Sequence, residues 1–96
     1  MEVLVAYDVA TDTAQGRKRL RKVAQVCLNC GQRVQKSVFE CSVSEMQYDD
    51  LRFQLLKCVN LKEDNLRIYR LREPKDRHIE HFGVKKPLDL DEPLIL

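Results

Sequence analysis

No apolar stretch of this sequence approaches the length of about 20 residues that a membrane-spanning helix needs. The N-terminus also lacks a basic leader followed by a cleavage site, because it runs straight into a strand-like segment at Val3. These absences argue against membrane insertion and against secretion, so we expect a cytoplasmic chain that makes no contact with a membrane. The 96 residues leave room for a single domain.

The four cysteines lack the partners that a structural zinc site requires. Cys27 and Cys30 form a C-x2-C pair, but Cys41 and Cys58 do not repeat its spacing. In a chain without a secretion signal, free thiols are expected rather than disulfides. Cys27 falls on the apolar stripe of a predicted helix, where it would pack as a small hydrophobic residue.

Acidic residues are missing from residues 16–36, although the whole chain has a formal net charge of only +2. This concentration of positive charge is typical of a protein that binds a phosphate backbone. A solvent-exposed helix face with no ligand is the alternative. The seven cations of this stretch are Arg17, Lys18, Arg19, Arg21, Lys22, Arg33 and Lys36.

The hydrophobic periodicity alternates between strand and helix along the chain. The predicted strands cover Glu2–Val9, two short strands or one bent strand within Gln32–Val43, Leu66–Leu71, and a fifth strand from His78 to Gly83. The first helix follows a polar turn and ends near Cys30, with Gly31 expected as a left-handed C-cap. Ser44 begins a capping-box pattern that opens the second helix.

This order predicts an α+β, ferredoxin-like βαββαβ sandwich in residues 1–82, with an extra C-terminal strand and a tail in residues 83–96. Two helices would cover one face of a four-stranded sheet. The other face also carries apolar residues, and a chain this short buries only part of the surface that it exposes when unfolded. A two-fold homodimer is the simplest way to cover that second face.

One carboxylate, Asp8, interrupts the apolar first strand near its end. A carboxylate inside a protein must be paired, hydrogen-bonded or bound to a metal. Beside a basic helix, this position suits a divalent metal and a phosphodiester, and it equally suits nucleic-acid binding alone. A turn-forming or helix-capping aspartate is the structural alternative.

Three separated motifs together resemble the CRISPR-associated protein 2 family over nearly the whole chain. The first strand ends in Tyr7-Asp8, residues 16–19 read Gly-Arg-Lys-Arg, and residues 35–40 read Gln-Lys-Ser-Val-Phe-Glu. Residues 86–91, Lys-Pro-Leu-Asp-Leu-Asp, are similar to the tails in parts of that family. The combination is specific, whereas each piece alone would be a weak signal.

The resemblance implies a ferredoxin-like homodimer that acts in CRISPR adaptation beside the integrase CRISPR-associated protein 1. In that role the dimer holds duplex spacer DNA through basic residues. Several family members are also metal-dependent endonucleases on RNA or DNA, which implies that Asp8 is the catalytic residue and the Mg²⁺ ligand. The nucleic-acid-binding positions of the family fall on Tyr7, Arg17, Arg19, Arg33 and Phe39.

Physical chemistry limits the nuclease interpretation. Mg²⁺ takes six oxygen ligands, and one chain offers one well-placed carboxylate, so two Asp8 side chains would have to meet in a dimer. No general base is evident, because His78 and His81 lie far away in the sequence. A metal-activated water would then be the nucleophile. We therefore expect a scaffold with conditional nuclease activity.

The C-terminal tail is polar at its start and apolar at its end. An apolar, extended terminus commonly adds a strand to the edge of a sheet. We expect that this end docks the integrase or closes over the partner in the dimer through Leu94, Ile95 and Leu96.

Two other functional classes stay open. Small ferredoxin-like toxins that cleave mRNA share the predicted architecture, so a toxin-like RNA endonuclease is the main alternative. A metal-binding or regulatory ferredoxin-like domain is the third, although the cysteine spacing does not support it.

Overall fold

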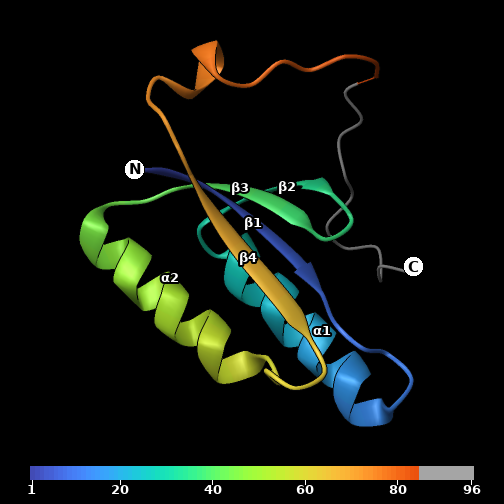
Figure 1. Ribbon diagram of the computed structural model, residues 1–96. Helices are drawn as coiled ribbons and strands as arrows, with labels where there is room; N and C mark the ends of the chain where they lie inside the picture. The colour runs from blue at the N-terminus through green and yellow to red at the C-terminus, as the bar shows by residue number, and fades with distance from the viewer. Residues whose placement is uncertain (85–96) are drawn as a thin grey trace.

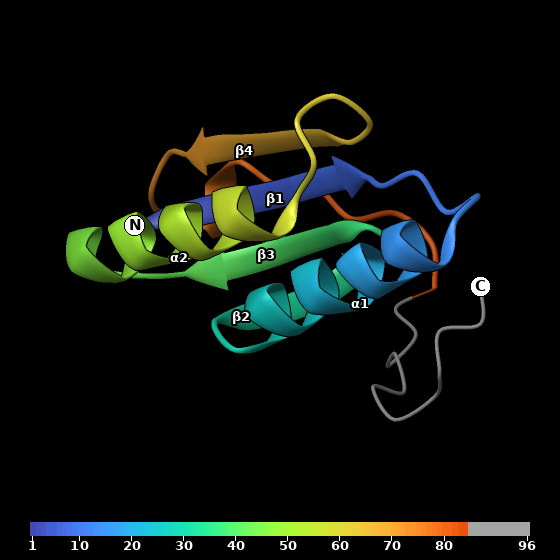
Figure 2. The ribbon, with the colours of Figure 1, turned by 90° about the horizontal axis from the view of Figure 1, so that it is seen from below.

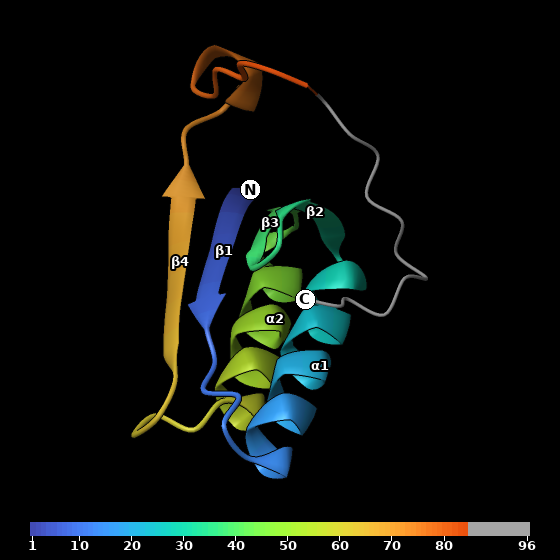
Figure 3. The same cartoon turned by 90° about the vertical axis from the view of Figure 1, so that its right-hand side faces the viewer.

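The computed structural model of the protein describes residues 1–84, which form a four-stranded sheet covered on one face by two helices (Figure 1). Figures 2 and 3 show both helices on the same side of the sheet. In chain order the elements are β1 (Glu2–Asp8), α1 (Ala14–Leu28), β2 (Gly31–Gln35), β3 (Val38–Ser42), α2 (Glu45–Cys58), β4 (Asn65–Leu71) and a short 3₁₀ helix (Lys75–Arg77).

The strands are arranged in the order β2-β3-β1-β4, and every neighbouring pair is antiparallel. This arrangement confirms the predicted ferredoxin-like βαββαβ topology. The central strand β1 aligns Val5 with Phe39 of β3 and with Ile68 of β4. Because residues opposite each other in antiparallel strands share a face, these three side chains all point toward the helices.

The core lies between the sheet and the helices. Val3, Val5 and Tyr7 of β1 are buried there, as strand alternation requires, whereas Asp8 at the end of the strand is exposed. The helices supply their apolar stripes at i, i+3 and i+4 spacing. The stripe residues that are buried are Val23, Ala24 and Cys27 of α1 and Tyr48, Leu51 and Leu55 of α2.

Both helices begin at residues that bind the free backbone N–H groups of the first turn. The Thr13 hydroxyl accepts a hydrogen bond from Gly16 N at 3.0 Å. Ser44 and Gln47 form the complete capping box that the sequence predicted, with reciprocal hydrogen bonds of 2.8 and 3.1 Å. The two helix starts are therefore determined by local sequence.

The prediction that Gly31 ends α1 in a left-handed conformation was wrong. Asn29 at the C-cap is right-handed, and Gly83 is the one described residue with positive φ. Gly31 instead opens β2, where a Cβ atom would overlap the Glu40 carbonyl and the Cys41 side chain. Glycine is needed here because two backbones approach closely.

The strand predicted from His78 to Gly83 is absent from the described residues. β4 ends at Leu71, and Pro74 is followed by the 3₁₀ helix and irregular chain as far as Val84. Proline cannot donate a hydrogen bond to a strand ladder, so it favours the end of the strand. The tail beyond residue 84, including Leu94, Ile95 and Leu96, lies outside the described part of the chain.

The sheet face opposite the helices has no covering layer within residues 1–84 (Figure 3). Leu4 and Ala6 of β1 lie at its centre and are partly exposed, and Tyr69 of β4, aligned with Leu4, is 43% exposed. This face therefore carries apolar residues at its centre, as predicted, with Glu40 and Arg67 aligned beside Leu4 and Ala6. Within residues 1–84, no helix has the length and apolar character to cross a membrane.

Candidate functional site

Asp8 is the last residue of β1 and is exposed, at the end of the sheet where the chain turns toward α1 (Figure 1). It is aligned with Asn65, the first residue of β4. Within residues 1–84, no hydrogen bond or ion pair occupies its carboxylate. The carboxylate is thus available to a ligand. Within residues 1–84 it neither caps a helix nor holds a turn.

A single chain does not assemble a complete metal site around Asp8. Among residues 1–84, no three His, Cys, Asp or Glu side chains are placed to hold a metal ion. His78 and His81 follow the 3₁₀ helix, which lies beyond the opposite end of the sheet from Asp8 in Figures 1 and 3. Neither imidazole is therefore placed to act as a base at Asp8.

Arg19 forms an ion pair inside the protein. Its guanidinium donates to both carboxylate oxygens of Asp64, at 2.8 and 3.2 Å, and lies 3.6 Å from Glu63. The Arg19 side chain is 16% exposed and that of Asp64 is 0% exposed. As placed, Arg19 forms a bidentate pair with a buried carboxylate, and its predicted contact with phosphate stays a prediction.

Asp64 also accepts hydrogen bonds from the backbone N–H groups of Ala10, at 3.0 Å, and Asn60, at 2.8 Å. The Arg19 side chain and these N–H groups hold the pKa of Asp64 below its ordinary value, against the opposing effect of burial. The Asp64 carboxylate therefore links three segments, namely the β1–α1 connection, α1 and the α2–β4 connection. Sequence reasoning missed Asp64 because a lone aspartate in a polar link carries no local signal.

Tyr7, Phe39 and Arg33 form a stack on the helix-facing side of the sheet. The rings of Tyr7 and Phe39 lie 6.1 Å apart at an angle of 21°, and the Arg33 guanidinium lies 4.9 Å from the centre of the Phe39 ring. Their exposed fractions are only 6%, 0% and 7%, in the order Tyr7, Phe39 and Arg33. The sequence analysis placed these three residues in one site. They do lie together, but in the core. As placed, they expose little side-chain surface, and their predicted contact with nucleic acid stays a prediction.

The charge of Arg33 is offset by the aromatic face beneath it, which is a favourable site for a guanidinium. Burial raises the pKa of Tyr7, and the nearby Arg33 guanidinium reduces that rise. The Tyr7 hydroxyl and Arg33 Nε have no hydrogen-bond partner within the described residues. The raised pKa of Tyr7 keeps its hydroxyl neutral at neutral pH.

Arg17 is exposed, unlike Arg19 and Arg33. Its Nη1 donates to the Thr11 carbonyl at 3.2 Å, which leaves the other guanidinium donors free. Lys18, Arg21 and Lys22 follow it on α1 and are exposed as well. Arg17 is thus the one arginine of the predicted nucleic-acid set whose side chain faces solvent.

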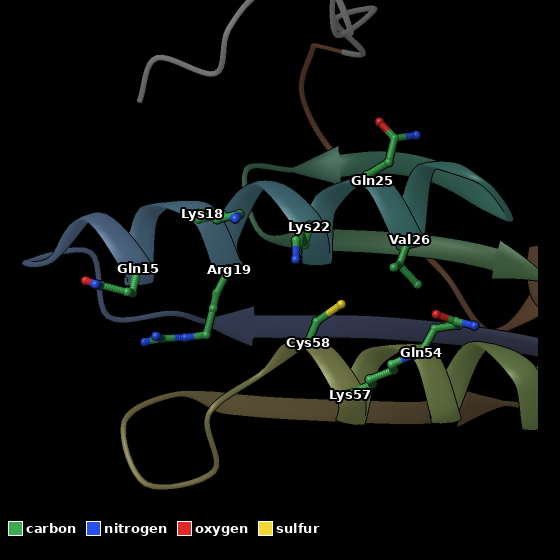
Figure 4. Close-up of a pocket in the computed structure, with 9 residues that line it drawn as sticks. All are labelled: Gln15, Lys18, Arg19, Lys22, Gln25, Val26, Gln54, Lys57 and Cys58. Carbon is green, nitrogen blue, oxygen red and sulfur yellow. The ribbon is translucent and has the colours of Figure 1, made fainter.

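A groove of about 550 Å³ runs between α1 and α2, and its rim is basic (Figure 4). Lys18 and Lys22 project from α1, and Lys57 faces them from α2. The residues of the described chain that line it include glutamines from both helices but no carboxylate. Sequence analysis identified the α1 cations, but Lys57 joins them only in the folded chain.

A family model described as CRISPR associated protein Cas2 matches residues 1–79. This chain belongs to the Cas2 family. The CRISPR-associated endoribonuclease Cas2 1 of Moorella thermoacetica is 58% identical to it over 96 residues, which cover 100% of each chain. The CRISPR-associated endonuclease Cas2 of Halalkalibacterium halodurans is 50% identical over 95 residues, with 99% of each chain covered.

The fold is also that of solved Cas2 proteins. The crystal structure of Streptococcus pyogenes Cas2 at pH 6.5 aligns with a TM-score of 0.77 and 48% identity, covering 86% of this chain and 100% of that one. The resemblance drawn from residues 7–8, 16–19 and 35–40 is thereby confirmed. Membership of the Cas2 family favours the CRISPR interpretation over the toxin-like and the metal-binding alternatives.

Proposed function

We propose that this chain is a CRISPR adaptation factor: a homodimeric scaffold that holds duplex spacer DNA together with the integrase CRISPR-associated protein 1. Membership of the Cas2 family supports the link to CRISPR. The observation that carries the DNA-binding part is the row of exposed cations on α1, beside a groove without carboxylates.

Phosphates would be bound mainly by Arg17, Lys18 and Lys22 of α1, with Lys57 of α2 on the other side of the groove. All four side chains are exposed. No carboxylate of the described chain lines the groove between the helices, so nothing there repels a polyanion. Lysine and arginine contacts to phosphates release counterions from the duplex. Such binding is largely independent of base sequence, as a scaffold for spacers of many sequences requires.

The salt dependence of duplex binding tests this proposal. In Arg17→Ala/Lys22→Ala, affinity should fall for all duplex sequences alike, and the slope of log affinity against log salt should flatten by about 2. The matched control is Arg52→Ala, which removes an exposed cation of α2 that does not line the groove. An unchanged slope in the double variant would move the site elsewhere, first to the basic stretch from Arg67 to Arg77.

The homodimer is supported by the sheet face that the helices leave uncovered. Leu4, Ala6 and Tyr69 form an apolar centre on that face within the described chain. Packing two such faces about a two-fold axis would remove both from water. It would also bring into one structure two copies of Asp8, which belongs to the same face of β1.

We also propose a conditional, Mg²⁺-dependent endonuclease activity on RNA or DNA, with Asp8 as metal ligand and catalytic residue. Two relatives of the chain, an endoribonuclease and an endonuclease by name, support this class of reaction. The exposed Asp8 carboxylate is the type of ligand that Mg²⁺ prefers, but one chain supplies only one, so Asp8 of the second copy is needed. When bound, Mg²⁺ would supply an activated water and offset phosphate charge.

A further inference from the structure

Two sulfur atoms are in contact, and they are not the pair that the C-x2-C spacing suggests. Cys30, in the turn between α1 and β2, has its Sγ 3.6 Å from Sγ of Cys41 on β3. Both cysteines are free thiols. A disulfide bond is about 2.05 Å long, so the two sulfur atoms must move together by about 1.5 Å.

Gly31 explains why two distant segments bring their thiols together. Gly31 and Cys41 are aligned partners in the β2–β3 ladder. A Cβ atom on Gly31 would overlap the Cys41 sulfur and the Glu40 carbonyl, so glycine lets the turn approach β3 closely. Cys30 precedes Gly31 directly and is thereby held against Cys41. The thiol pair is a consequence of strand register.

Access to the two thiols is unequal. Cys30 is partly exposed, whereas Cys41 is 1% exposed. Cys27, the other member of the C-x2-C pair, is 0% exposed. A reagent in solution therefore reaches Cys30 first and finds Cys41 directly behind it. This is the arrangement of an attacking and a resolving thiol.

We propose that Cys30 and Cys41 form a reversible disulfide site, closed by exchange with a low-molecular-weight disulfide such as oxidised glutathione. Cys30 loses its proton to water and attacks one sulfur of the small disulfide, whose S–S bond breaks and releases one thiolate. Cys41 then loses its proton, attacks the Cys30 sulfur and displaces the second thiolate. Two protein thiols are oxidised, and one small disulfide is reduced to two thiols.

Burial raises the pKa of Cys30 and of Cys41, because it disfavours the thiolate form. Since the thiolate is the attacking species, closure is slow at neutral pH and accelerates about tenfold per pH unit below the pKa of Cys30. A reducing cytoplasm keeps both thiols reduced, and accumulation of small disulfides closes the pair. The cross-link ties the end of α1 to β3 around β2.

The test is incubation of the full chain with oxidised glutathione, followed by thiol counting and peptide mapping without reductant. The four thiols should fall to two, with a single intramolecular link between Cys30 and Cys41, and reductant should restore all four. The oxidised chain should unfold at a higher temperature than the reduced chain. Cys27→Ser and Cys58→Ser are the matched controls and should still form the link.

Cys30→Ser replaces the partly exposed thiol and should abolish the link, with its circular dichroism spectrum confirming that the chain folds. A link from Cys27 to Cys30 would overturn the proposal, and so would a link between two chains. Four thiols that persist under prolonged incubation at elevated pH would overturn it as well.

Discussion

Asp64 binds the guanidinium of Arg19 through both carboxylate oxygens, at 2.8 and 3.2 Å, across 45 residues of sequence. The same oxygens accept the backbone N–H groups of Ala10 and Asn60. The pair fixes the start of α1 against the loop that leads into β4. It also engages the guanidinium of Arg19, whereas Arg17 of the same basic run is exposed.

The first prediction concerns acid stability. The folded-state pKa of Asp64 is lowered, so its contribution to stability is present above the unfolded value of about 3.9 and is lost as pH falls through the folded value. Asp64→Ala should lower the free energy of unfolding at neutral pH by about 1–3 kcal/mol, since backbone N–H groups lose their acceptor. The variant should also show a smaller loss of stability below pH 4 than the wild type.

Urea unfolding at a series of pH values measures both effects. Glu63→Ala is the matched control, because its carboxylate is about half exposed and lies 3.6 Å from Arg19. An Asp64→Ala chain as stable as the wild type at neutral pH would show that the ion pair does not hold these segments together.

The second prediction distinguishes the role of Arg33 in duplex binding from that of Arg17. Arg33→Met keeps a long side chain over Phe39 but loses the charge, and it should leave the salt slope of duplex binding unchanged, because Arg33 is 7% exposed. Phe39→Ala should cost about 3–5 kcal/mol of stability, since it empties a fully buried site. A flattened slope in folded Arg33→Met would show that Arg33 reaches phosphates.

The third prediction concerns the uncovered sheet face. Wild-type chain at micromolar concentration should give the mass of a dimer in light scattering. Leu4→Lys should give a folded monomer, because it places a charge at the apolar centre of that face. Met46→Lys is the control, since Met46 is 82% exposed on α2 and away from the sheet. A monomeric wild type, or a dimer that tolerates Leu4→Lys, would contradict the proposed interface.

The fourth prediction concerns Asp8. Asp8→Ala should remove any Mg²⁺-dependent cleavage of RNA or DNA and leave duplex binding and spacer acquisition intact, because the exposed carboxylate takes no part in packing. The assay compares cleavage with and without Mg²⁺ in both chains. If a folded, dimeric Asp8→Ala chain loses acquisition, chemistry at Asp8 matters to the pathway and the scaffold proposal is wrong.

The fifth prediction concerns the tail. Deletion of residues 93–96, which include Leu94, Ile95 and Leu96, should abolish co-purification with the integrase and spacer acquisition. Duplex binding through Arg17 and its neighbours should persist, since those side chains belong to α1. Retained co-purification in the truncated chain would place the integrase contact elsewhere.

The sequence by itself determined the elements and their order, because the signals involved are local. The alternation of β1, the stripe from Val23 to Cys27 and the capping box at Ser44 each depend on residues within one or two turns of each other. The motifs at residues 7–8, 16–19 and 35–40 were sufficient to indicate the family. β4 ends at Leu71, and the local pattern from His78 onward was misleading, because a strand also needs a neighbour to pair with.

Only the tertiary structure decided which charged groups are paired and which thiols meet. Arg17 and Arg19 stand two residues apart in one basic run, yet Arg19 is neutralised by Asp64 from a loop that the fold brings beside it. Arg33 lies over Phe39 because β2 aligns it with that residue. Cys30 meets Cys41 for the same reason, through the register at Gly31. These are contacts between segments far apart in sequence, and periodicity carries no information about them because it reports one element at a time.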